Sequence, residues 1–235
     1  MKILALDCSA GPASCAVIEN GEIKASAFVN AKLTHSQTLL PMVQNTLSSA
    51  MLSIEDINAF AINNGPGSFT GIRIGISAVK GLAAPDNKPC IPVSTLFSIA
   101  YSFVNQNCIV CAVMDARCNQ VYNALFKVES GKVTRLCDDR AALIDDVLSE
   151  LNGFDGQTVI IAGDGANLFS RFTNLEKNII IAKEPLRFQN ACSVGLAAEQ
   201  LMLTEAPLCA KELSPFYLRL PQAERELRAK KETKI

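Results

Sequence analysis

The stretch Gly65-Pro66-Gly67-Ser68-Phe69-Thr70-Gly71-Ile72-Arg73-Ile74-Gly75 decides how this chain folds. The run from Ala59 to Ile62 before it predicts a strand, and its glycines and proline favour a tight turn. Ser68 or Thr70 can cap a helix that continues to Leu82. The free backbone N–H groups at the start of that helix suit a phosphate. The glycines equally suit a second helix that packs closely.

The composition indicates a cytoplasmic protein with a large core. The chain has 235 residues, enough for one large domain or two small ones. Lys and Arg number 22 against 23 Asp and Glu, so the net charge gives no overall attraction to nucleic acid. Hydrophobic residues make up 49% of the chain, which leaves apolar surface for a partner. No apolar run approaches the roughly 18 residues of a membrane span, and the start Met1 to Asp7 predicts a strand and not a signal peptide.

The nine cysteines favour reduced thiols in a core. Cys108 and Cys111 have C-x-x-C spacing, but they lie in a run that predicts a strand. Side chains three apart on a strand point to opposite faces, so this pair is not expected to bind a metal.

Two helices are predicted in the first ninety residues. Thr34 and Gln37 have capping-box spacing and open a helix that contains Pro41, which is expected to bend it. Its predicted apolar face is Leu40, Val43, Leu47 and Ala50, with Leu39 and Met42 as a shorter flank. The helix after the glycine turn has one apolar face of Ile72, Ile76, Val79 and Ala83 and another of Gly71, Gly75, Ala78 and Leu82. Two apolar faces predict burial on two sides, either inside the core or against a partner.

The chain then repeats its pattern. A buried strand ends at Asp7 before a hairpin at Asn20-Gly21, and another ends at Asp115 before a hairpin at Ser130-Gly131. Further strands are predicted at 14–18, 23–29, 91–93, 121–128, 133–137, 159–162 and 179–182, and further helices at 94–104, 141–151 and 191–203. The prediction is an α/β fold of two β-β-β-α-β-α halves, 1–105 and 106–221, followed by a charged tail, 222–235.

Two halves of this kind describe the actin, hexokinase and heat-shock ATPase architecture. The motifs in chain order are Ile3-Leu4-Ala5-Leu6-Asp7, His35-Ser36-Gln37-Thr38-Leu39-Leu40-Pro41, Gly65 to Gly75, Lys80-Gly81-Leu82-Ala83, Val93-Ser94-Thr95-Leu96, Asp115-Ala116-Arg117 and Tyr217-Leu218-Arg219. With these motifs the chain resembles the bacterial TsaB (YeaZ) proteins from Met1 to about Arg219.

That resemblance implies a non-catalytic subunit of the complex that makes threonylcarbamoyladenosine in tRNA, at the adenosine beside the anticodon. The implied partners are the catalytic paralogue TsaD, the small ATPase TsaE and a second copy in a homodimer, with tRNA met only through the complex. The resemblance places the contacts on the helix from His35 and the helix from Gly71. Candidate partner residues are His35, Leu39, Leu40, Val43, Arg73, Ile74, Ser77 and Lys80.

The residues agree with a scaffold that has no catalytic residue and no metal site. The catalytic paralogue holds a metal with two histidines spaced i, i+4, whereas His35 is the only histidine here and Leu39 follows it at that spacing. The superfamily's Asp-x-Gly phosphate loop is replaced by Asp7-Cys8-Ser9.

Residues for a vestigial nucleotide site are Asp7, Ser9, Asp115, Arg117, Gly163 and Gly165. No cofactor is expected, and a nucleotide, if bound, would not be hydrolysed by this subunit alone. Two alternatives stay open. One is a nucleotide-binding ATPase or sugar-kinase relative, since a fold alone does not fix a function. The other is a peptidase that uses Thr34-His35-Ser36, although neighbouring residues at a helix start do not face one another.

Overall fold

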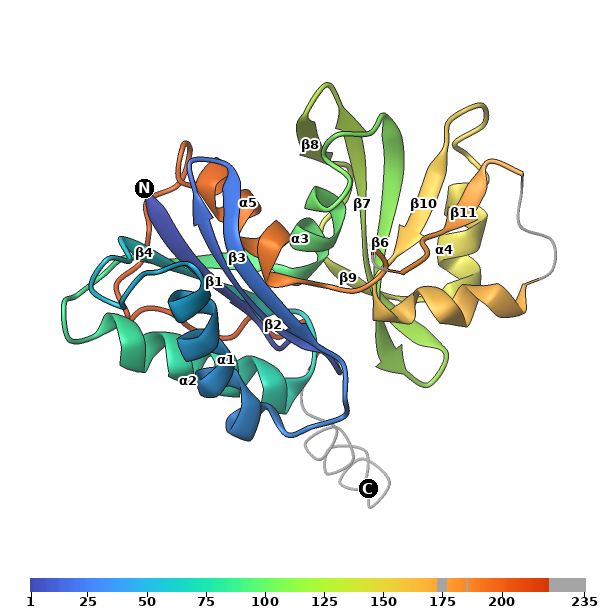
Figure 1. Cartoon of the computed structure of the whole chain (residues 1–235). Helices are drawn as coiled ribbons and strands as arrows, with labels where there is room; N and C mark the ends of the chain where they lie inside the picture. Colours follow the sequence, from blue (N-terminus) through green and yellow to red (C-terminus); the bar gives the residue numbers. More distant parts are fainter. Residues whose placement is uncertain (173–176, 185, 220–235) are drawn as a thin grey trace, which may run out of the picture.

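The computed structural model describes residues 1–172, 177–184 and 186–219, and it contains two twisted sheets (Figure 1). The first sheet has the order β3-β2-β1-β4-β5, from β1 (Lys2–Asp7), β2 (Ala13–Glu19), β3 (Glu22–Val29), β4 (Ala59–Gly65) and β5 (Cys90–Ser94). The second has the order β11-β10-β6-β7-β8, from β6 (Cys108–Arg117), β7 (Gln120–Glu129), β8 (Lys132–Arg135), β10 (Val159–Ala162) and β11 (Ile179–Ile181), with β9 (Arg140–Leu143) paired to β7. The predicted α/β class and its two related halves are confirmed.

The two predicted hairpins share one turn geometry. Asn20 and Gly21 have φ angles of 53° and 80°, and Ser130 and Gly131 have φ angles of 53° and 75°. Two consecutive positive φ angles match the right-handed twist of the flanking strands. Each hairpin follows a strand with a parallel neighbour, β4 for β1 and β10 for β6. The same arrangement therefore recurs in both halves.

Helices cover both faces of both sheets. On the first sheet, α1 (His35–Ser49) and α2 (Phe69–Ala83) pack on one face and α5 (Ala191–Leu201) on the other. On the second sheet, α3 (Thr95–Tyr101) packs on one face, and α4 (Ile144–Leu151) with the 3-10 helix η1 (Asp164–Arg171) packs on the other. In Figure 1, α3 and α5 lie between the two sheets.

One helix from each half of the sequence packs on the sheet of the other half. α5 follows the second sheet in sequence but packs on the first, whereas α3 follows the first sheet and packs on the second. A boundary near residue 105 remains a prediction, and the predicted tail 222–235 lies outside the described residues.

Several local predictions were wrong at the level of single elements. The expected helix 141–151 begins only at Ile144, because Ala141 and Ala142 pair with β7 as part of β9. The helix expected at 94–104 ends at Tyr101, and η1 was not predicted. Ser94 does cap α3, since its hydroxyl accepts a hydrogen bond from the backbone N–H of Phe97 at 3.3 Å.

The buried face of α1 also differs from the predicted one. Leu40 is 52% exposed, and the face that meets the core consists of Leu39, Met42, Val43, Thr46 and Leu47. Thr46 fits there because its hydroxyl donates to the carbonyl of Met42 at 2.8 Å. Thr34 precedes the helix, but its side chain makes no capping hydrogen bond, so the capping box is not formed.

The prediction of thiols in the core holds for five of the nine cysteines, whereas Cys118 is exposed and Cys137, Cys192 and Cys209 are half-buried. All nine lie within the described ranges and are free thiols. Cys108 and Cys111 on β6 belong to the clusters on opposite faces of the second sheet. They therefore do not share a metal ion. Within the described ranges, no helix is both long and apolar enough to span a membrane.

Candidate functional site

The glycine turn packs against the loop that follows β1. A Cβ atom on Gly71 would lie 2.0 Å from the Cys8 carbonyl oxygen, and one on Gly75 would lie 2.6 Å from the Cys8 sulfur. The Cys8 thiol donates to the Gly71 carbonyl at 3.1 Å. The predicted close approach to these glycines is confirmed, but a partner helix does not make it. The chain's own loop occupies this space.

Further contacts fix the same loop to the two helix starts. The backbone N–H of Ser68 donates to the Ser9 carbonyl at 2.6 Å, and its hydroxyl accepts from the Gly71 N–H at 3.2 Å. Ser68, and not Thr70, therefore caps α2. His35 Nε2 donates to the Ala10 carbonyl at 2.9 Å. The single histidine thus anchors the start of α1 to the loop.

A groove of about 430 Å³ lies between α1 and α2. Its lining residues are His35, Ser36, Leu39, Leu40, Arg73, Ile74, Ser77 and Ala78. Most of the predicted partner residues are therefore brought together on one surface. Leu40 and Ser77 are exposed, whereas Leu39 is buried.

The remaining two predicted partner residues lie elsewhere. Val43 is 4% exposed and belongs to the core cluster beneath α1. The ammonium of Lys80 donates to the Lys211 carbonyl at 3.2 Å. In this structure neither side chain contributes to the groove.

Arg73 joins the groove to the segment 214–219. Its guanidinium lies 3.8 Å from the centre of the Phe69 ring, and its Nε donates to the Tyr217 hydroxyl at 2.8 Å. The rings of Phe69 and Tyr217 stack at 4.6 Å. A guanidinium held against aromatic faces gains a cation–π attraction. Phe69 and Tyr217 belong to separate sequence motifs, and no local pattern indicates that their side chains meet.

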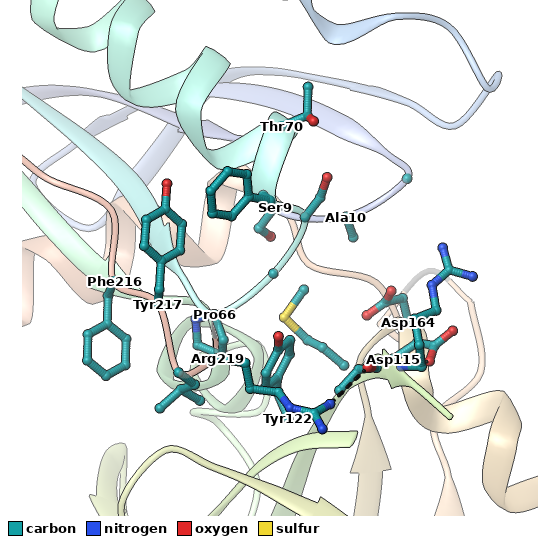
Figure 2. A pocket seen from close by; sticks show the side chains of 18 residues that line it. Ser9, Ala10, Pro66, Thr70, Asp115, Tyr122, Asp164, Phe216, Tyr217 and Arg219 are labelled. Carbon is teal, nitrogen blue, oxygen red and sulfur yellow. Dashed lines mark hydrogen bonds between the residues drawn. The ribbon is translucent and has the colours of Figure 1, made fainter. Parts of the chain in front are cut away.

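A cleft of about 630 Å³ lies between the two sheets (Figure 2). Of the predicted nucleotide-site residues, Ser9, Asp115 and Arg117 line it, and Asp164 joins them. Figure 2 shows Asp115 and Asp164 close together at one end, with Phe216 and Tyr217 at the other.

Burial raises the pKa of two carboxyl groups in this region, Asp164 and Asp7. Burial, and then repulsion from Asp115, raises the pKa of Asp164 to about 6 although Gln189 donates to it at 3.0 Å. Burial also raises the pKa of Asp7. Its Oδ1 accepts from the Ser9 hydroxyl at 2.6 Å and from the Asn63 amide at 2.8 Å.

The two glycines among the predicted nucleotide-site residues, Gly163 and Gly165, are required by packing. Gly163 has φ +114°, and a Cβ there would lie 1.9 Å from the Val113 carbonyl oxygen. A Cβ on Gly165 would lie 2.9 Å from the Met114 carbonyl carbon. Both positions let η1 approach β6 closely.

The described residues of the cleft fit a nucleotide with its metal poorly. Arg219 already donates to the Ala116 carbonyl at 3.2 Å and to the Gln120 side chain. Arg117 is the remaining cation of the described lining, and it stands beside Asp115 and Asp164. The loop after β1, which would approach a phosphate, is already bonded to the glycine turn, because its Ser9 carbonyl accepts from the Ser68 N–H. Throughout the described ranges, no three His, Cys, Asp or Glu side chains gather to hold a metal ion.

The peptidase alternative has no supporting geometry. His35 Nε2 donates to the Ala10 carbonyl and its Nδ1 has no hydrogen-bond partner among the described residues, so neither Thr34 nor Ser36 is paired with the ring. In the described part of the chain, the His35 ring makes no hydrogen bond to a serine or cysteine. A nucleophile–base pair needs that contact.

Sequence comparison identifies the family. Residues 29–227 match the family model described as TsaD: tRNA N6-adenosine threonylcarbamoyltransferase. The tRNA threonylcarbamoyladenosine biosynthesis protein TsaB of Haemophilus influenzae is 32% identical over 228 residues, covering 93% of this chain and 94% of the relative. The chain belongs to the TsaB family. The TsaB of Escherichia coli is 38% identical over a shorter region, which covers 64% of this chain and 65% of that relative.

Solved structures agree with this assignment. YeaZ from Pseudomonas aeruginosa has a TM-score of 0.79 and 27% identity, covering 92% of this chain and 99% of that one. The ROK hexokinase from Thermus thermophilus has a TM-score of 0.50 and 10% identity, covering 87% of this chain and 100% of that one. The second likeness shows the shared fold alone.

Proposed function

We propose that this chain is a cytoplasmic, non-catalytic subunit of the machinery that makes threonylcarbamoyladenosine in tRNA, where it binds the transferase TsaD. The names of its TsaB relatives support the pathway. The α1–α2 groove is the observation that carries the binding role. TsaE and tRNA are proposed to meet this chain only within the complex.

The groove has the features of a helix-docking surface. Two adjacent helices present Leu40, Ile74 and Ala78 at a shallow opening, with Arg73 at its side. An amphipathic helix of a partner can lay its apolar face into such a groove. A paralogue of the same fold carries an equivalent helix pair, so the four helices can form a bundle. A second copy of this chain can use the same surface, which makes the homodimer a competitor for TsaD.

Substitution of Ile74 tests the docking surface. Ile74→Glu places a charge in the groove, where binding would bury it without a partner, so we expect at least about a hundredfold weaker binding to purified TsaD. Ser77→Arg is expected to act by steric exclusion. Titration calorimetry measures both affinities, and Ile180→Glu is the matched control because Ile180 is 49% exposed on β11. If both groove variants bound TsaD with wild-type affinity, this assignment of the interface would be wrong.

Reconstitution tests the proposed role itself. Purified TsaD, TsaE and the threonylcarbamoyl-adenylate synthase are incubated with tRNA, with and without this chain, and the modified nucleoside is quantified. We expect modification to depend on this chain and to fall with Ile74→Glu. Modification that proceeds equally well without it would remove the proposal. Heat released by this chain alone with ATP and Mg²⁺ would favour the ATPase alternative.

A further inference from the structure

We propose that a second cavity, between the β2–β3 hairpin and the ends of α3 and α5, binds an uncharged aromatic small molecule. Its volume is about 590 Å³. Small-molecule sites occupy roughly 300–1,000 Å³. Among the described residues, its lining shares no member with the cleft between the sheets or with the α1–α2 groove. It is therefore a separate site, and the proposal does not depend on the proposed function.

The cavity exists because α5 leaves the edge of the first sheet open. Successive side chains of a strand alternate between faces. On β3, Ala27 and Val29 pack toward α1, whereas Ser26 and Phe28 belong to the other face. α5 packs mainly on the inner strands β1 and β2, and β3 is the edge strand. Phe28 is consequently 48% exposed although it is a large apolar side chain.

Aromatic and aliphatic side chains form the walls. The rings of Phe28 and Phe188 are 6.5 Å apart, with 39° between their planes. Ile23 is 50% exposed and Leu186 is 42% exposed on the same lining. An aromatic ligand placed against the phenylalanine pair makes offset or edge contacts. It also removes these apolar side chains from water.

The polar groups of the lining select an uncharged ligand. No lysine or arginine belongs to the described lining. Its one carboxylate, on Glu184, already accepts from Arg187 at 2.8 Å. The guanidinium of Arg187 lies 4.8 Å from the centre of the Phe188 ring, but its charge is already paired with Glu184 and it is not part of the described lining.

Cys192 is part of the cavity but is not a nucleophile. Burial raises the pKa of its thiol. The thiolate is the reactive form of cysteine, so a raised pKa keeps this side chain neutral and inert. Binding is therefore non-covalent, and the lining favours a flat, uncharged aromatic ring.

Fluoroindole supplies these properties as a probe. The full-length protein is titrated with 5-fluoroindole and followed by ¹⁹F NMR, with saturable binding and a Kd below about 1 mM expected. In Cys192→Trp the new indole side chain fills the inner side of the cavity. In Ser26→Trp it fills the mouth of the cavity. Each is expected to weaken binding by about tenfold or more. Cys118→Trp is the matched control, because Cys118 is exposed at the β6–β7 turn and lies outside the cavity lining. This variant is expected to bind the probe as the wild-type protein does.

Two results would overturn the site. One is the lack of saturation by the wild-type protein at millimolar probe. The other is unchanged binding in Ser26→Trp, whose exposed position allows folding even if Cys192→Trp does not fold. Indole-3-carboxylate tests the charge argument, because an anion is expected to bind about tenfold more weakly than fluoroindole. Equal binding of the two would contradict an uncharged ligand.

Discussion

At the scale of residues, α2 offers two glycines in opposite surroundings. A methyl group at Gly71 would lie 2.0 Å from the Cys8 carbonyl oxygen, whereas one at Gly81 would meet nothing within 4 Å. We expect Gly71→Ala to lower the free energy of unfolding by about 3 kcal/mol, since the loop after β1 must move. Gly81→Ala should raise it by about 0.5–1 kcal/mol through helix propensity. Urea unfolding measures both, and equal effects would refute this packing.

Asp164 gives the stability a defined pH dependence. Its pKa rises from 3.8 to about 6 in the folded protein, mainly by burial. The folded state therefore binds this proton more tightly between about pH 4 and 6, so stability falls as pH rises through that window. The contribution is at most about 3 kcal/mol. We expect Asp164→Asn to flatten this slope in urea unfolding from pH 4.5 to 7. The control Asp155→Asn should keep it, because Asp155 is exposed, and a slope retained in Asp164→Asn would exclude this group.

At the scale of elements, the sequence predicted what local patterns encode. The hairpin at Asn20-Gly21, the strand that ends at Asp7 and the buried face of α2 all depend on neighbouring residues, and they were predicted correctly. The start of α4 was not, because Ala141 and Ala142 join β9 only when β7 is beside them. Propensity is a weak guide where tertiary pairing decides.

The candidate sites also depend on contacts between distant residues, which sequence patterns do not reveal. The family resemblance assigned Leu40 and Ile74 to the partner-binding helices, and both line the groove. The contacts of Gly71 with Cys8 and of Arg73 with Tyr217 join residues far apart in the chain. A small residue or a cation in a sequence indicates that something packs against it, but not what. The glycines were therefore assigned to a partner, while the chain's own loop holds that position.

At the scale of the whole molecule, the exchanged helices make the two sheets depend on each other. α5 seals the first sheet through apolar contacts, and α3 seals the second. The approach of α5 is close, since a Cβ on Gly195 would lie 2.3 Å from a side-chain carbon of Ile18. Segment 214–219 also bridges the sheets, with the Phe216 N–H donating to the Asn64 carbonyl and Arg219 donating to the Ala116 carbonyl. Neither half can bury its sheet alone.

We therefore expect the full chain to unfold in a single cooperative transition. A fragment of residues 1–105 lacks α5, so the face of its sheet that includes Ala5 and Ile18 would be exposed to water, and we expect it not to fold by itself. Circular dichroism and calorimetry test both points, with equal calorimetric and van't Hoff enthalpies marking one transition. Gly195→Val should weaken the packing of α5, on which both halves depend. The transition temperature should therefore fall while the transition remains single. Two separate transitions, or a folded 1–105 fragment, would show that the halves are independent domains and that α5 serves only as a cover.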